Sequence, residues 1–354
     1  MGLVIIGSGI AGSSLAYELE KTNLKYFICT DKNNSLMNTS RYSYGHFRLA
    51  TNLEELVDRS VSQLGEDREK MEFIYSQTNL IPKFLDEINI EYEKRSFGII
   101  PVKQRGGIKI LKKLQKNLKI NTGTELIDFK KNNNNMFDIY LKNRNNNEIF
   151  RIQSKYLVLA TGGYSGKYEN TDNVKYNSYN IFDLVKKNNG KIINTHCKFI
   201  HPFGYNGGKK ILIGKQAKSG EFVDKDGNYV FKKKQREMIK NDNYHEIFDQ
   251  LIKQADECRQ KGSDVYFISS NEDLNLNKKN SEKNEIDKKT IITPCIHYTS
   301  GGIKTDYLGR VKGIENLFAI GECQANGSRN NGRFPGYPFT SSIVYAKKLG
   351  EYFI

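Results

Sequence analysis

The sequence has few cysteines, and none stand at the spacing of a metal or redox pair. Its 354 residues include five cysteines, an odd number, scattered without a C-x-x-C pair. This pattern argues against a disulfide framework and against a zinc site. We therefore predict that the cysteines are free thiols.

Long hydrophobic runs are also lacking. No apolar run reaches the ~18 residues of a membrane span, although 38% of the residues are hydrophobic, which suffices for a core. The apolar start over residues 3–6 follows no basic leader and breaks at Gly7, so it is typical of a buried strand rather than a signal peptide. We predict a soluble globular protein, long enough for two domains, in the cytoplasm and without a membrane partner.

Basic residues are in surplus, but no pattern interleaves them with aromatic ones. The 55 lysines and arginines exceed the 40 acidic residues and give a net charge of +15. The lysines are spread along the chain among many asparagines, which indicates solvated surfaces. An alternative is a positive field that attracts anions toward a site. We predict no nucleic-acid partner.

A glycine-rich turn follows the first apolar run. Glycines stand at positions 7, 9 and 12, and residues 13–20 have helical spacing. In a strand–turn–helix unit the first glycine makes the tight turn, the second lets the backbone approach a pyrophosphate, and the third lets the helix pack on the strand. The helix N-terminus then stabilises the phosphate charge. We predict a dinucleotide site formed by Gly7, Ser8, Gly9, Ala11 and Gly12.

The next apolar run, residues 26–30, ends at Asp31. A dinucleotide-binding fold places the group that meets the adenosine ribose roughly 20 residues after the glycine turn. Asp31 is therefore the first candidate for this contact, with Thr30 beside it.

The following segments have helical and then strand-like patterns. Residues 53–90 look helical, and residues 108–118 form an amphipathic helical pattern. Three alternating apolar runs between residues 125 and 152, separated by asparagine-rich turns, predict a β-meander that leads into a buried strand over 156–163. Residues 275–289 are polar and are expected to form a loop.

Motifs from the middle and the end of the chain resemble one flavoprotein family. Thr161-Gly162-Gly163-Tyr164 is similar to an A-T-G-G step, His201-Pro202 to an F-H-P step, and residues 297–302 to an H-Y-x-x-G-G step. With a strand that we predict to end in Gly321-Glu322, they resemble the succinate dehydrogenase and fumarate reductase flavoprotein family, which includes L-aspartate oxidase. The resemblance covers nearly the whole chain.

The resemblance implies an α/β fold. We expect a Rossmann-like FAD-binding domain, with a parallel sheet and a β-meander, over residues 1–202 and 292–354. An inserted α+β capping domain is expected over residues 203–291. The sequence ends at Ile354, so the C-terminal helical domain of the larger relatives is expected to be absent. This disfavours an assembly with iron-sulfur and membrane subunits.

The resemblance also implies that the cofactor is FAD. Glu322 is expected to hydrogen-bond the flavin ribityl chain. Further cofactor contacts are expected from Gly45, Thr161, Gly162, Gly163 and Thr340. Thr39 stands where succinate dehydrogenase has the histidine that carries covalent flavin, so we predict non-covalent FAD.

Substrate residues follow from the same comparison. Arg333 falls where the family has A-N-R and would be the carboxylate clamp, because a guanidinium fork suits bidentate binding. His201 and His297 would hydrogen-bond the other substrate oxygens. The family's proton-shuttle arginine has no convincing counterpart here. Lys240 and Arg236 are its substitutes at best, and each is more commonly a solvated helix charge.

The resulting hypothesis is an FAD-dependent oxidoreductase similar to L-aspartate oxidase. Hydride would pass between a small dicarboxylate or amino-dicarboxylate and flavin N5, and dioxygen or fumarate would reoxidise the flavin. Two alternatives stay open. One is a soluble fumarate reductase or succinate dehydrogenase-type flavoprotein. The other is an FAD-binding protein that has lost the family's catalysis, which the missing arginine would explain.

Overall fold

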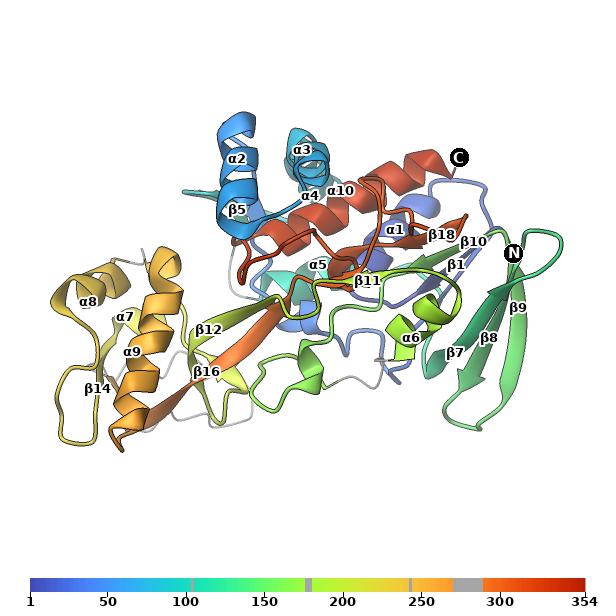
Figure 1. The fold of residues 1–354 in the computed structure, drawn as a ribbon. Helices are drawn as coiled ribbons and strands as arrows, with labels where there is room; N and C mark the ends of the chain where they lie inside the picture. The colour runs from blue at the N-terminus through green and yellow to red at the C-terminus, as the bar shows by residue number, and fades with distance from the viewer. Residues whose placement is uncertain (103–104, 176–179, 242–243, 270–288, 354) are drawn as a thin grey trace. The chain divides into compact units, whose positions relative to one another are not determined.

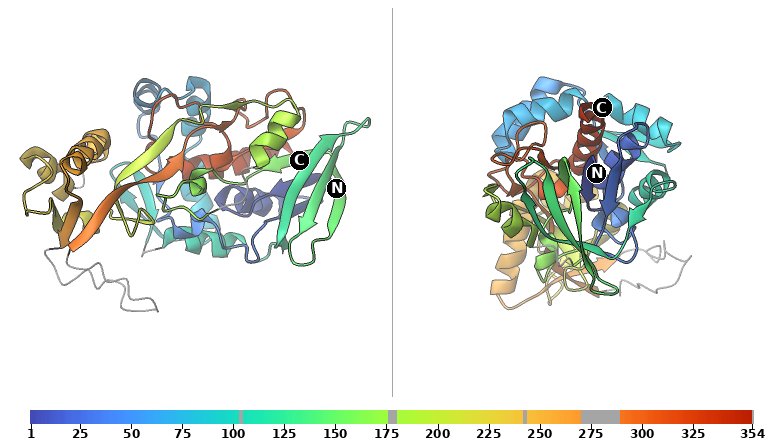
Figure 2. Two further views of the ribbon diagram at one scale, coloured as in Figure 1. Left: turned by 60° about the horizontal axis from the view of Figure 1, so that its bottom comes forward. Right: turned by 90° about the vertical axis from the view of Figure 1, so that its right-hand side faces the viewer.

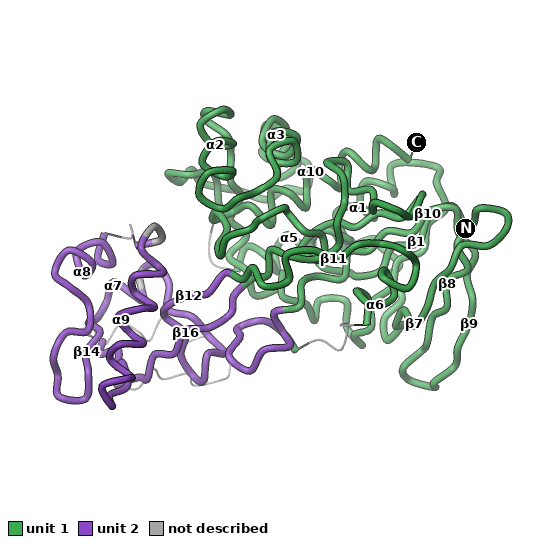
Figure 3. Tube along the Cα trace, in the orientation of Figure 1, with its two compact units in different colours: residues 1–164, 174–198, 298–354 green, residues 165–173, 199–297 purple. Residues whose placement is uncertain are grey.

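The chain divides into two compact units. The computed structural model describes residues 1–102, 105–175, 180–241, 244–269 and 289–353. Unit 1 comprises residues 1–164, 174–198 and 298–354, and unit 2 comprises residues 165–173 and 199–297 (Figure 3). The domain boundaries expected from the sequence stay a prediction beside this division. The polar loop expected over 275–289 lies, except for Lys289, outside the described residues.

A parallel five-stranded sheet forms the centre of unit 1 (Figure 1). Its order is β18-β10-β1-β2-β6, and each neighbouring pair is parallel. The strands are β1 (Leu3–Ile6), β2 (Tyr26–Cys29), β6 (Ile120–Asn121), β10 (Tyr156–Leu159) and β18 (Leu317–Ala319). The α/β fold with a parallel sheet is confirmed.

Each face of this sheet has its own core. Leu3 and Ile5 of β1 pack in one cluster with helices α1 (Ile10–Leu19) and α10 (Tyr337–Tyr352). Val4 and Ile6 pack in a second cluster with residues of the meander and of α6 (Asn180–Lys187). Successive side chains of a strand point to opposite faces. The continuous apolar run of β1 therefore indicates a strand that is buried on both faces.

The helical stretch after residue 52 consists of three helices. These are α2 (Leu53–Leu64), α3 (Arg68–Ser76) and α4 (Leu80–Glu87). Gly65 ends α2 in the left-handed conformation, at φ 65°. The Asp67 side chain then caps α3 by accepting a hydrogen bond from Lys70 N at 3.1 Å. The predicted helical region is confirmed, and α5 (Gly106–Leu114) confirms the helix expected at 108–118, although it ends four residues earlier.

A three-stranded antiparallel meander lies between β6 and β10, as predicted (Figure 2). It comprises β7 (Thr124–Lys131), β8 (Phe137–Asn143) and β9 (Ile149–Ser154). Asn135 and Asn147 make the tight turns with positive φ angles of 58° and 60°, a conformation that asparagine adopts more readily than most residues. Two smaller sheets complete unit 1: β3 (Phe47–Arg48), β5 (Gly98–Pro101) and β4 (Tyr92–Arg95), and β11 (Ile192–Ile193) with β17 (Gly302–Ile303).

Unit 2 is an α+β unit around a second five-stranded sheet of order β13-β12-β16-β15-β14. Its strands are β12 (Lys198–Tyr205), β13 (Lys210–Ile211), β14 (Gly220–Val223), β15 (Val265–Ser269) and β16 (Lys289–Thr299). Its helices are α7 (Lys215–Lys218), α8 (Lys233–Lys240) and α9 (Phe248–Gln260). The core is aromatic, with Phe203 stacked on Phe222 at 4.3 Å between ring centres.

Candidate functional site

Two of the three glycines of the glycine-rich turn, Gly7 and Gly12, are required for steric reasons. Gly7 has φ 110°, and a Cβ there would lie 2.3 Å from Ala160 O. A Cβ on Gly12 would lie 2.0 Å from Gly7 O, so this glycine allows α1 to pack on the turn. Gly9 precedes α1 in an ordinary conformation, and a Cβ there would meet only Ser40 Oγ, at 3.5 Å. Gly9 therefore marks the open side of the turn, where a pyrophosphate backbone contact is expected.

Side chains distant in sequence hold this turn in place. Gln115, which follows α5, donates from Nε2 to Ser8 O at 2.9 Å and accepts from Ser35 Oγ at 2.8 Å. Ile10 N, at the start of α1, donates to Ser40 Oγ at 3.1 Å. Sequence reasoning missed Gln115, Ser35 and Ser40, because nothing in their local patterns points to a turn up to 107 residues away.

Asp31 and Thr30 follow the carboxyl end of β2, beside β1 and its turn. Thr30 is buried, and its N–H donates to Asn121 O at 3.0 Å. The Asp31 carboxylate is paired with Lys32 Nζ at 3.0 Å and lies 3.6 Å from the Arg144 guanidinium. The structure brings Asp31 to the expected edge of the sheet, and its contact with a ribose stays a prediction.

The motif around Gly163 and the one around Glu322 meet at the carboxyl ends of β10 and β18. These two strands are paired in parallel. Glu322 Oε1 accepts from both the N–H and the hydroxyl of Thr299, each at 3.0 Å. A Cβ on Gly163 would lie 2.1 Å from the same oxygen. Glu322 lies in the 3-10 turn Gly321–Cys323, just after β18 rather than within it.

Small residues keep this edge of the sheet open or closely packed. Gly162 has φ 78°, and a Cβ there would meet no atom within 4 Å. The hydroxyl of its neighbour Thr161 is buried. A Cβ on Gly321 would lie 2.9 Å from the Ala11 side chain, so α1 and the Glu322 turn touch. The structure thus brings together in unit 1 the glycine turn, residues 161–163 and Glu322.

Gly45 and Thr340 have structural contacts of their own. Gly45, at φ 76°, packs against Gly106, 3.0 Å from where its Cβ would be. Thr340 Oγ1 accepts from Arg48 N and donates to Arg48 O, both at 2.9 Å. Both hydrogen-bonding roles of the hydroxyl are thereby used to join α10 to β3, and the cofactor contacts of Gly45 and Thr340 stay predictions.

Arg333 lies in a loop that is held by contacts with Tyr298 and Ser300. Its guanidinium carbon is 5.0 Å from the centre of the Tyr298 ring, within range of a cation–π interaction. Ser300 Oγ donates to Gly332 O at 3.1 Å. Burial, and then the charge of Glu322, raise the pKa of the Tyr298 hydroxyl well above its ordinary value. Tyr298 therefore stays neutral and contributes a ring face to Arg333.

Two further guanidinium groups lie beside this loop. Those of Arg48 and Arg59 are 5.0 and 5.5 Å from the centre of the Phe334 ring, and Arg48 Nε donates to Pro335 O at 2.9 Å. The charges of Arg59 and Arg333 both act on Arg48. We call Arg48, Arg59 and Arg333 the arginine cluster. No sequence motif points to Arg48 or Arg59.

A buried carboxyl group, Glu66, lies near the arginine cluster. Its Oε1 accepts from Asn326 Nδ2 at 2.8 Å and from Ser328 Oγ at 3.4 Å. Burial raises the pKa of Glu66 to about 8, while hydrogen bonds and the charge of Arg48 oppose the rise. Glu66 is therefore mostly protonated at neutral pH and does little to neutralise the arginines.

The two predicted histidines come together within unit 2. Their ring centres are 6.3 Å apart. His201 is 3% exposed, and its Nδ1 accepts from Phe203 N at 3.2 Å. His297 Nδ1 lies 2.7 Å from Asp172 Oδ2. Asp172, which sequence reasoning missed, is 125 residues upstream of His297.

Lys240 and Arg236 share a carboxylate partner in unit 2. Lys240 Nζ lies 2.5 Å from Glu221 Oε1, and the Arg236 guanidinium lies 4.0 Å from Glu221 Oε2. Residues four apart on α8 lie on one helix face. Arg236 also stacks on Tyr229, at 3.7 Å from the ring centre. Both cations are thus held by Glu221, with half of the Lys240 side chain exposed.

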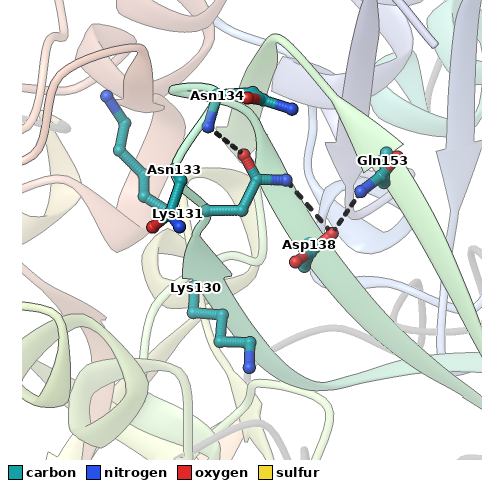
Figure 4. Close-up of a pocket in the computed structure, with 7 residues that line it drawn as sticks. Lys130, Lys131, Asn133, Asn134, Asp138 and Gln153 are labelled. Carbon is teal, nitrogen blue, oxygen red and sulfur yellow. Dashed lines mark hydrogen bonds between the residues drawn. The ribbon is translucent and has the colours of Figure 1, made fainter.

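Other candidate sites are weak. Figure 4 shows an open polar hollow on the meander, where Asp138 accepts from Gln153 and Asn132, and its lining includes none of the predicted site residues. Within the described residues, no group of three or more histidine, cysteine, aspartate or glutamate side chains could hold a metal ion. In the same part of the chain, no helix is long and apolar enough to cross a membrane.

Comparison with known proteins assigns the family. A family model described as "FAD binding domain" matches residues 102–337. The chain belongs to this FAD-binding family. A model described as "pyridine nucleotide-disulphide oxidoreductase" matches residues 1–197, which include the glycine turn.

Two further similarities specify the branch of the family. L-aspartate oxidase of Clostridium perfringens is 24% identical over 98% of this chain and 85% of its own length. A quinol fumarate reductase chain of E. coli matches the structure with a TM-score of 0.82 at 16% identity, over 99% of this chain and 69% of its own. This flavoprotein is thus an FAD-dependent oxidoreductase of the succinate dehydrogenase and fumarate reductase family, close to L-aspartate oxidase.

The fold alone does not determine the substrate. A 3-ketosteroid delta1-dehydrogenase of Sterolibacterium denitrificans also matches, with a TM-score of 0.72 at 10% identity and 99% coverage of both chains. Function depends on the site that a fold carries. The substrate therefore depends on the side chains of the site rather than on the fold.

The residues present fit FAD. A Cβ on Gly162 would meet nothing within 4 Å, and one on Gly9 only Ser40 at 3.5 Å, so a cofactor can approach both stretches of backbone. Both lie at the carboxyl edge of the parallel sheet, where such folds bind dinucleotides. Glu322 adds a carboxylate acceptor at the same edge.

Proposed function

We propose that this flavoprotein transfers hydride between a small dicarboxylate or amino-dicarboxylate, with L-aspartate favoured, and flavin N5. The arginine cluster is the observation that carries the proposal. Three guanidinium groups lie around Phe334 and Tyr298, and the pKa of the nearby Glu66 carboxyl group is raised to about 8. A substrate with two carboxylates would neutralise this charge better than an uncharged one.

Each site residue has a distinct role in the proposal. Arg333 binds a substrate carboxylate through two parallel hydrogen bonds, and the Tyr298 ring keeps its guanidinium in place. His201 hydrogen-bonds a remaining substrate oxygen, and His297 does so in the state in which its Nε2 is protonated. Lys240 is the proton-transfer candidate that the sequence offers, held by Glu221. FAD, when bound, supplies the hydride acceptor.

Flavin bleaching tests the proposal directly. The purified holoprotein is mixed anaerobically with L-aspartate, with succinate, and with L-asparagine, which lacks the second carboxylate. We expect the flavin absorbance to bleach with a dicarboxylate and not with L-asparagine. Arg333→Ala should abolish bleaching while flavin content is kept. Arg329→Ala is the matched control, because this exposed arginine lies in the same loop. No bleaching by either dicarboxylate would disprove the substrate class.

The alternatives differ in what happens after reduction. An oxidase should be reoxidised rapidly by dioxygen, whereas a fumarate reductase should react with fumarate and only slowly with dioxygen. A protein that has lost catalysis would show neither reaction. Non-covalent attachment of FAD, which we also propose, would be contradicted by flavin that stays on the polypeptide after acid precipitation. A cytoplasmic location stays a prediction.

A further inference from the structure

The two histidines of unit 2 have different hydrogen-bond partners on Nδ1. An ionised carboxylate only accepts hydrogen bonds, so His297 Nδ1, 2.7 Å from Asp172 Oδ2, carries a proton. A backbone N–H only donates. His201 Nδ1 accepts a hydrogen bond from Phe203 N–H, so it carries no proton. In their neutral forms, His297 therefore presents an unprotonated Nε2 and His201 presents an Nε2–H.

The segment that carries Asp172 is fixed to the strand that carries His297. Ile296 N donates to Asn170 O at 2.8 Å, and Thr171 Oγ1 donates to Ile296 O at 2.7 Å. Asn173 Nδ2 donates to His297 O at 2.8 Å. These bonds follow β16 on both sides of Asp172. They explain why residues 165–173 belong to unit 2 although the sequence around them belongs to unit 1.

We propose that Asp172 and His297 are the proton-transfer pair of this flavoprotein. This assignment rests on the proposed function. As hydride leaves the substrate carbon for the flavin, His297 Nε2 accepts the accompanying proton. In an amino-dicarboxylate a carbon–nitrogen double bond forms and the nitrogen releases the proton. In a saturated dicarboxylate a carbon–carbon double bond forms and the neighbouring carbon releases it. Asp172 is a positioning residue that fixes the tautomer and neutralises the imidazolium.

The other candidates fit this role less well. Neutral His201 presents an Nε2–H, so it can donate but not accept at that atom. A lysine ammonium likewise only donates, and Glu221 binds Lys240 at 2.5 Å. His297 is also the more accessible histidine, with 26% of its side chain exposed against 3% for His201 as a whole.

A tautomer measurement tests the pair without relying on turnover. Long-range proton–nitrogen correlation spectra are recorded on the holoprotein labelled with ¹⁵N-histidine, at mildly alkaline pH. His297→Gln assigns the His297 signal among the five histidines. We expect a protonated Nδ1 and an unprotonated Nε2 at His297, and a mixture of tautomers in Asp172→Asn. A proton on Nε2 of His297 in the wild type would overturn the proposal.

Kinetics test the catalytic part. Asp172→Asn should lower kcat roughly 10²- to 10⁴-fold and leave KM nearly unchanged, and Asp172→Glu should restore part of the rate. Asp256→Asn, which removes an exposed carboxylate of α9, is the control. Melting temperature and flavin content establish that each variant folds. Wild-type kcat in Asp172→Asn would overturn the proposal.

The proton-transfer pair and the proposed function can be disproved separately. If the wild type bleaches with a dicarboxylate and Asp172→Asn does so equally fast, the proton-transfer pair is wrong and the proposed function stands. If no dicarboxylate bleaches the wild type, the proposed function fails and the catalytic role of the pair fails with it. The tautomer spectra still decide whether Asp172 sets the protonation of His297.

Discussion

The edge of the unit 1 sheet where FAD is expected and the histidine site of unit 2 depend on different kinds of contact. In unit 1 the decisive positions have no side chain: a Cβ on Gly7, Gly12 or Gly163 would lie 2.0–2.3 Å from another atom. In unit 2 the decisive feature is a contact between two side chains, His297 and Asp172. A steric requirement restricts one position to glycine, whereas two side chains that contact each other can stand at any distance apart in the sequence. The first therefore leaves a motif at its own positions. In the second, His297 stands in the H-Y-x-x-G-G step, but its partner Asp172 stands in no motif.

The largest effect is expected where this steric requirement is broken. Gly12→Ala places a Cβ 2.0 Å from Gly7 O. It should destabilise unit 1 by about 1–3 kcal/mol or more and abolish flavin binding. Gly9→Ala has room for its Cβ and should keep the melting temperature of the apoprotein while lowering flavin content. Flavin absorbance per protein and thermal melting check both, and full flavin content in Gly12→Ala would refute the steric account.

The carboxylate clamp comes next. Arg333→Lys keeps the positive charge but loses the two-pronged geometry, so KM for a dicarboxylate should rise roughly 10- to 100-fold, the equivalent of about 1.5–3 kcal/mol. Steady-state kinetics measure the change, with Arg329→Lys as control. An unchanged KM would mean that Arg333 makes no bidentate contact with the substrate.

Glu66 offers a stability effect with a defined pH dependence. Burial raises the pKa of Glu66 from about 4.5 to about 8 in the folded protein, so the folded state holds this proton more tightly than the unfolded state. The stabilising contribution is complete below about pH 4.5 and is lost as the pH rises to about 8, at about 1.4 kcal/mol per pKa unit. Glu66→Gln should remove this part of the pH dependence.

Urea denaturation across this pH range measures the Glu66 effect. Glu72→Gln, an exposed residue of α3, is the control and should leave the pH profile as it is. If Glu66→Gln has the same profile as the wild type, the carboxyl group is not protonated in the folded protein.

The smallest effect is expected at Lys240. Half of its side chain is exposed in its ion pair with Glu221, and exposed ion pairs contribute about 0–1 kcal/mol. Lys240→Ala should therefore lower kcat/KM less than about tenfold. A loss as large as that expected for Asp172→Asn would move the proton-transfer role from His297 to Lys240.

Local patterns predicted most of the fold. The buried run of β1, the glycine turn and the three-stranded meander each have a signal within a few residues. Element ends were less certain. The strand predicted to end in Gly321-Glu322 instead ends at Ala319, and Gly321, with φ 71°, starts a 3-10 turn.

The site was only partly predictable because several of its contacts join distant residues. Arg333, His201 and His297 were suggested by resemblance to family motifs. Asp172, Gln115 and Glu66 act through side-chain contacts that span 125, 107 and 260 residues. A single sequence contains no periodicity or spacing that links such positions, so only the three-dimensional structure brings them together.

Strand β16 has a covalent consequence for the proposed chemistry. His297 is the last residue of unit 2, and Tyr298, whose ring contacts Arg333, is the first residue of the following segment of unit 1. One peptide bond joins them, so their Cα atoms stay about 3.8 Å apart however the two units are arranged. His297, which is proposed to take the proton, and Tyr298, whose ring supports Arg333, are therefore joined directly by the backbone.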